Sequence, residues 1–177
     1  MAGWYGARMN GTLLADAFGH HVWATLQLID ACSPLGAEQL ATPVPGTYGS
    51  ILETTRHLVG ADAAYLFVVS GGRRPEIAEA GMGLAELRAA MEANGPAWSV
   101  VLGEDLDPAA IVVRHRDDGS TSSAPLGIRL AQAIHHGTDH RSQICTALTS
   151  LGIEPPSIDA WDFAQQDGRL GETPPTA

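Results

Sequence analysis

The hydrophobic positions of this chain recur with the period of an α-helix in four long segments. In each segment apolar side chains return every three or four residues, so that they share one face of a helix. Serine, proline and glycine residues stand between the segments, and such residues end helices. The pattern predicts helices from Thr12 to Ala31, from Ser50 to Val69, from Leu84 to Leu102 and from Pro125 to Leu151.

One stretch departs from the helical pattern. Between Ala109 and Arg116 the chain is rich in β-branched residues, and the sequence Asp117-Asp118-Gly119-Ser120 follows. β-branched residues favour strands, and clusters of Asp, Gly and Ser favour turns. We therefore expect a short strand and a turn, as in a hairpin, inserted before the last long helix.

The four helices have about 20 residues each and would therefore be about 30 Å long. Helices of this length with one apolar face predict an all-α protein, a four-helix bundle in which facing helices can build a metal site in the core. The chain has 177 residues, enough to bury a core without disulfides. We expect one domain over residues 1–170 and a flexible tail over residues 171–177.

The net charge of the chain disfavours some classes of binding partner. The formal net charge is -10 and the isoelectric point is near 4.9, so nucleic acid and anionic membrane surfaces are poor partners. No apolar run reaches the length of about 18 residues that a membrane span needs, and residues 1–10 lack a secretory pattern. We expect a cytoplasmic protein.

The chain contains no lysine, since all ten basic residues are arginine. Schiff-base chemistry, pyridoxal phosphate anchoring and P-loop phosphate binding all use lysine and are therefore excluded. The two cysteines, Cys32 and Cys145, form neither a Cys-x-x-Cys motif nor a disulfide framework. Any nucleophile is thus expected to come from outside the chain.

Histidine spacing gives the main indication of function. His136 and His140 lie four residues apart in the last helix, so that their imidazoles share one face. His57 lies on the face of the second helix that also carries small alanines. Three such histidines could hold one metal ion and leave coordination positions open, as catalytic zinc sites do. His135 and His115, in contrast, are expected at the surface.

Two further residues are candidates for moving protons at such a site. Glu53 precedes His57 by four residues and could support it, ligate the ion through oxygen, or act in catalysis. His21 lies in the middle of the apolar face of the first helix, where a hydrogen-bonded core histidine is the plainer interpretation. The spacing fits neither a zincin protease nor a ferritin-like di-iron site, which favours a single ion.

Three segments together resemble the DinB-like family, which includes mycothiol-dependent maleylpyruvate isomerases and related thiol S-transferases. They are His57-Leu-Val-Gly-Ala-Asp62, the run His136-x-x-x-His140-Arg-Ser-Gln143, and the segment from Pro155 to Phe163. The resemblance covers the chain from about Leu14 to Phe163. It implies an up-down-down-up bundle and a divalent ion, zinc or nickel, held by His57, His136 and His140.

The function implied by the resemblance is a thiol-dependent S-transferase or isomerase. Its partners would be a low-molecular-weight thiol such as mycothiol and a small electrophilic substrate. An ion with an open position could instead activate water, which would make the protein a metal-dependent hydrolase. A non-catalytic, stress-related metal-binding homodimer is the alternative from a different class, since a shared fold does not fix the chemistry.

Overall fold

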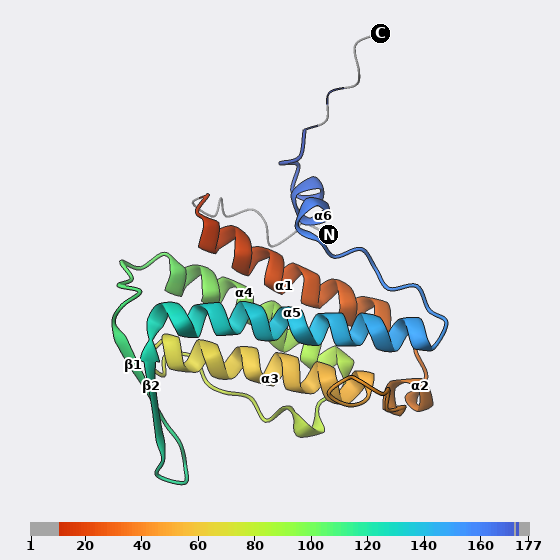
Figure 1. Cartoon of the computed structure of the whole chain (residues 1–177), viewed down its shortest axis with the longest axis horizontal. Helices are drawn as coiled ribbons and strands as arrows, with labels where there is room; N and C mark the ends of the chain where they lie inside the picture. The colour runs from red at the N-terminus through yellow and green to blue at the C-terminus, as the bar shows by residue number, and fades with distance from the viewer. Residues whose placement is uncertain (1–10, 172, 174–177) are drawn as a thin grey trace.

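The computed structural model describes residues 11–171 and 173 and is mostly helical (Figure 1). Residues 1–10 of the predicted domain, and residues 172 and 174–177 of the predicted tail, lie outside the described residues. The elements are α1 (Leu13–Cys32), α2 (Ala37–Ala41), α3 (Ile51–Val69), η2 (Glu79–Gly81), α4 (Leu84–Leu102), β1 (Ile111–His115), β2 (Thr121–Pro125), α5 (Leu126–Ser150) and α6 (Ala160–Gln166).

The four predicted helices correspond to α1, α3, α4 and α5, each within about one residue at either end. Local chemistry explains two of the starts, because the hydroxyl of Thr12 accepts from the Ala15 amide and that of Ser50 accepts from the Glu53 amide. The short helices α2 and α6 have too few residues for a helical repeat to be visible in the sequence, and they were not predicted.

The long helices contact one another in a closed ring, in the order α1, α4, α3, α5 and back to α1. Figure 1 shows the four lying alongside each other. A large cluster of buried side chains, including Phe18, Met91 and Trp98, fills the space between them, and a second cluster around Leu58 and Ile144 continues it. Among the described residues, no helix combines the length and the hydrophobicity needed to cross a bilayer.

The interruption before the last helix is an antiparallel hairpin, as the sequence predicts. β1 pairs with β2 from Ile111 opposite Pro125 to His115 opposite Thr121, and Gly119 takes a positive φ of 81° in the turn. The hairpin extends from one end of the helices (Figure 1). The Arg129 guanidinium on α5 donates to the carbonyls of Val112 and Ser122, one on each strand, and so fixes the hairpin against α5.

Candidate metal centre

The tertiary structure brings the three predicted metal ligands together. His57 comes from α3, whereas His136 and His140 are one turn apart on α5, the helix that packs along α3. The Nε2 atoms of His136 and His57 are 3.0 Å apart, and those of His136 and His140 are 3.1 Å apart. Ligand atoms from all three side chains lie within 4.8 Å of one another. These three residues could therefore hold one metal ion.

The spacing of these nitrogens fits a small divalent cation. Ligands at about 2.0–2.1 Å from a tetrahedral zinc ion are separated from each other by about 3.3 Å. Hydrogen bonds among the three imidazoles cannot satisfy all of their Nε2 atoms. The reason is that Nε2 of His136 faces two other imidazole nitrogens and can donate to only one of them. A cation at the centre would be contacted by all three lone pairs.

Electrostatics keep the ligands in the form that binds metal. Burial, reinforced by His140 and His57, lowers the pKa of His136 to about 4. Burial also lowers the pKa of His57, with a further contribution from His140. Metal binding requires neutral imidazoles, so these two histidines are ready to bind at neutral pH without first releasing a proton.

Gln143 and Tyr48 support the histidines from outside the cluster. The side-chain oxygen of Gln143 lies 3.0 Å from Nδ1 of His140 and also accepts from the backbone amide of Tyr48. The Tyr48 ring stacks on His57, with ring centroids 4.2 Å apart and planes 8° apart. One glutamine thus connects the loop that carries Tyr48 to the histidine on α5.

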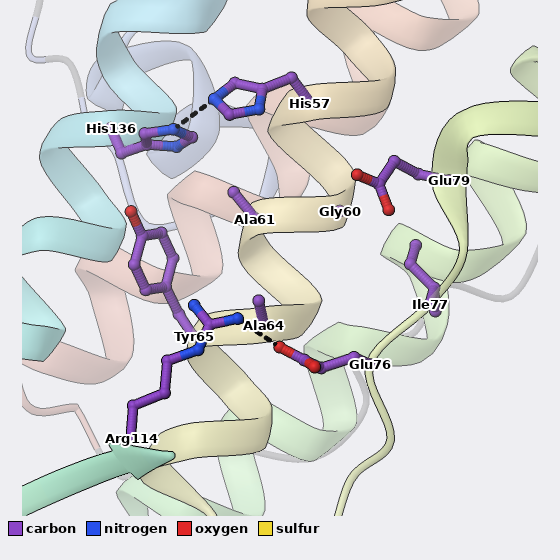
Figure 2. A pocket seen from close by; sticks show the side chains of 10 residues that line it. All are labelled: His57, Gly60, Ala61, Ala64, Tyr65, Glu76, Ile77, Glu79, Arg114 and His136. Atoms are coloured by element: carbon purple, nitrogen blue, oxygen red, sulfur yellow. Dashed lines mark hydrogen bonds and ion pairs between the residues drawn. The ribbon is translucent and has the colours of Figure 1, made fainter. Parts of the chain in front are cut away.

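A cavity of about 410 Å³ opens onto the histidines (Figure 2). It is lined by residues of α3, α5, β1 and the segment that contains η2: His57, Gly60, Ala61, Ala64, Tyr65, Glu76, Ile77, Glu79, Arg114 and His136. The small side chains of Ala61 and Ala64 on α3 leave space next to the imidazoles. Gly60 also allows Glu79 to approach α3, because a Cβ atom on this residue would meet Cδ of Glu79 at 2.5 Å.

Two more polar groups line the cavity: Arg114 lies at the end away from the histidines, and the hydroxyl of Tyr65 points toward His136 (Figure 2). Arg114 on β1 donates from Nη2 to Oε1 of Glu76 at 2.8 Å. Tyr65 on α3 accepts at its hydroxyl oxygen from the side-chain amide of Gln132, at 3.3 Å. The cavity therefore combines a candidate metal centre with hydrogen-bonding groups, an arrangement typical of small-molecule sites.

A second polar cluster lies buried beside the metal centre, and His21 is at its middle. The Arg141 guanidinium donates to Nδ1 of His21 at 2.8 Å, so the imidazole carries its proton on Nε2 and donates it to Asp62 at 2.9 Å. Asp62 also accepts from Asn94 and Trp98. Burial lowers the pKa of Arg141 to about 10, which leaves it charged at neutral pH. This cluster links α1, α3, α4 and α5.

The two residues predicted to move protons lie outside the three-histidine group. Glu53 is exposed, and its carboxylate accepts from the Ser50 amide at 2.9 Å in the capping box of α3, which lowers its pKa. His21 is buried and held at both ring nitrogens, and it is absent from the cavity lining. Phe18, on the same face of α1, is also almost fully buried.

Several site residues were not assigned a role from the sequence. Gln143 follows His140 by three residues, so helical spacing could have identified it. Tyr48, Glu79 and Arg114 come from a loop, a short 3-10 turn and the hairpin, and no local pattern connects them to the histidines. His135 and His115 are exposed, as predicted.

Comparison with known proteins gave a match to one family model. No curated protein matches the chain. The model of the DinB family matches residues 9–173, nearly the whole length, and this range contains all three histidines of the candidate metal centre. The chain therefore belongs to the DinB family.

Proposed function

We propose that this protein is a cytoplasmic, metal-dependent thiol S-transferase or isomerase, with its long helices in an up-down-down-up bundle. The observation that carries the proposal is access: the 410 Å³ cavity reaches His57 and His136, two of the three candidate ligands. A storage or structural site would be closed by a fourth protein ligand. Among the described residues the ligand group consists of the three histidines alone.

Neither a cysteine nor a lysine of this chain supplies the nucleophile in this proposal. Burial raises the pKa of Cys32 to about 12 and also raises the pKa of Cys145, so neither thiol ionises readily. Neither cysteine lines the cavity, and the sequence has no lysine. These facts favour a nucleophile that enters from solution, either a small thiol or water.

The residues of the cavity have distinct roles in this proposal. His57, His136 and His140 would hold a divalent ion, zinc or nickel, which when bound favours the thiolate form of a thiol. The Glu79 carboxylate, in the lining next to Gly60, can accept the thiol proton. The thiol sulfur then forms a bond to an electrophilic carbon of the substrate. The bond between that carbon and its leaving group breaks, and the leaving group departs with the electron pair.

The test is a conjugation assay after metal analysis of the purified protein. Protein loaded with zinc or nickel is mixed with 1-chloro-2,4-dinitrobenzene and, in turn, mycothiol, bacillithiol, glutathione or cysteine. We expect a metal-dependent rate with at least one thiol, together with release of chloride. His57→Ala should lose this rate, whereas the exposed His135→Ala should keep it.

Two results would overturn the proposal. If simple esters are hydrolysed in a metal-dependent manner while no thiol is conjugated, the protein is a hydrolase that uses activated water. If the protein binds metal stoichiometrically but accelerates neither reaction, it is a metal-binding protein without this catalytic activity.

A further inference from the structure

We infer that the Arg114 end of the cavity is a subsite for the carboxylate of a small-molecule substrate. This inference rests on the proposed function and names the substrate class that the site would take. Its elements are Arg114 on β1 and Glu76 before η2, which line the same cavity as His57 and His136 (Figure 2).

The guanidinium of Arg114 keeps most of its donors available. It has five N–H groups, and the structure gives it one hydrogen bond within the described residues, from Nη2 to Glu76. Both partners are partly exposed, 33% for Arg114 and 42% for Glu76. An exposed ion pair of this kind contributes little stability, so an incoming carboxylate could replace Glu76 at small cost.

Tyr65 adds a second donor between Arg114 and the histidines, because its hydroxyl points toward His136 (Figure 2). Its hydroxyl oxygen accepts from Gln132 at 3.3 Å. A hydroxyl group that accepts one hydrogen bond still has its own hydrogen to donate. A carboxylate at Arg114 would receive charge-assisted hydrogen bonds from the guanidinium, which are the stronger ones. The Tyr65 hydroxyl could donate to a polar group of the same ligand nearer the histidines.

The charges on the lining also favour an anion once the metal centre is loaded. Glu76, Glu79 and Arg114 together carry one negative charge in excess. A divalent ion held by three neutral imidazoles changes this to one positive charge in excess. A cationic ligand would be repelled by the ion and by Arg114. We therefore expect carboxylate binding to be stronger in the metal-loaded protein than after chelation.

The dimensions suit a molecule that reaches both ends of the cavity. The α3 residues of the lining run from His57 through Ala61 to Tyr65, two turns or about 12 Å along the helix. A compact molecule could place its carboxylate at Arg114 and its reacting atom near the histidines. The carboxylate could belong to the thiol or to the electrophile.

The test compares matched ligands by isothermal titration, which needs no turnover. The thiol pair is N-acetylcysteine and N-acetylcysteamine, which differ by one carboxylate. The electrophile pair is 4-chloro-3,5-dinitrobenzoate and the corresponding benzamide. For the ligand pair whose carboxylate the subsite recognises, metal-loaded wild-type protein should bind the acid at least about tenfold more tightly than its uncharged counterpart. Charge-assisted hydrogen bonds imply a difference of this size.

The variants separate this subsite from general effects. Arg114→Gln should reduce the acid preference to about one. Arg116→Gln should retain it, because Arg116 follows the same strand but contacts Ser120 and is absent from the lining. Glu76→Gln frees Arg114 and should raise affinity for the acid, a change that unfolding could not mimic. Equal melting temperatures of the two arginine variants would exclude a folding defect.

If Arg114→Gln removes the acid preference in the thiol pair, the recognised carboxylate belongs to the thiol. If it does so in the electrophile pair, the carboxylate belongs to the electrophile. If neither pair shows an acid preference that depends on Arg114, the inference is overturned, whatever the conjugation assay gives. Absence of conjugation with an intact, Arg114-dependent preference would overturn the proposed function and leave the subsite in place.

Discussion

The side-chain oxygen of Gln143 lies 3.0 Å from Nδ1 of His140 and accepts a hydrogen bond from the Tyr48 amide at the same time. An atom that accepts from a backbone amide is the oxygen of the glutamine, so Nδ1 of His140 must donate to it. The Nε2 atom of His140 therefore carries the lone pair that faces His57 and His136. Gln143 sets the tautomer that the metal centre requires.

Gln143→Ala should weaken metal binding without abolishing it. Supporting residues of this kind typically change metal affinity by about 10- to 100-fold. A competition titration with a chromogenic chelator measures the change. Gln132→Ala, which removes a glutamine of the same helix that contacts Tyr65 instead, should bind metal normally. Equal affinities of the two variants would show that Gln143 does not support the site.

The protein should bind one divalent ion per chain, and His57→Ala, His136→Ala or His140→Ala should each lose most of the affinity. Each histidine would supply one of three protein ligands, so its removal would leave an incomplete site. Metal content after gel filtration gives the measurement, with His135→Ala as the exposed neighbour that should bind normally. Stoichiometric metal in a variant that lacks all three histidines would contradict the assignment.

Gly137→Ala should destabilise the fold by about 1–3 kcal/mol, as overpacked core positions do. A Cβ atom at this position would lie 2.5 Å from Nδ1 of His21 and 2.9 Å from Nη1 of Arg141, both buried. Alanine is the better helix former, so stabilisation would be expected if packing were irrelevant. Urea unfolding measures the change in the free energy of unfolding. Gly60→Ala meets the partly exposed Glu79 side chain and should cost less.

Metal-free protein should lose stability as the pH falls from about 6.5 toward 4. Burial holds the pKa of His136 at about 4 in the folded state and lowers the pKa of His57 and His20. At a pH between the folded-state and unfolded-state pKa values of these histidines, the unfolded chain binds protons that the folded chain does not bind. This difference favours unfolding. Urea midpoints at pH 7 and pH 5 measure the loss. His136→Ala should show a smaller pH dependence than His135→Ala.

Neither cysteine should react with Ellman's reagent in the folded protein near pH 8. Burial raises the pKa of Cys32 to about 12 and raises that of Cys145, so little thiolate is present. Both should react after unfolding in guanidinium chloride, which provides the control. Rapid modification of Cys145 in the folded protein, with loss of thiol transfer, would point to a nucleophile within the chain.

The sequence by itself predicted the secondary structure and the three histidines that could hold a metal ion. Helical periodicity located the four long helices, and turn chemistry at Asp117–Ser120 located the hairpin. The four-residue separation of His136 and His140 placed both on one face of a helix, since that geometry is local. His57 could be selected because its helix face carries small residues and because its segment resembles the DinB-like family.

Local spacing did not reveal the partners that hold the side chains of Glu53 and His21. Glu53 shares a helix face with His57, but it is also the third residue after the Ser50 cap, and the backbone amide there engages its carboxylate. His21 lies on the apolar face of its helix, as expected. The partners that hold it, Asp62 and Arg141, come from two other helices.

Only the tertiary structure decided what surrounds the metal centre. The packing of α3 against α5 brings His57 to within 3.0 Å of His136, across 79 positions of the chain. Glu79 and Arg114 enter the cavity from a short 3-10 turn and from a hairpin, whose positions depend on long-range contacts such as those of Arg129. Helix and turn patterns depend on neighbours within a few residues, whereas a cavity lining depends on how distant segments pack.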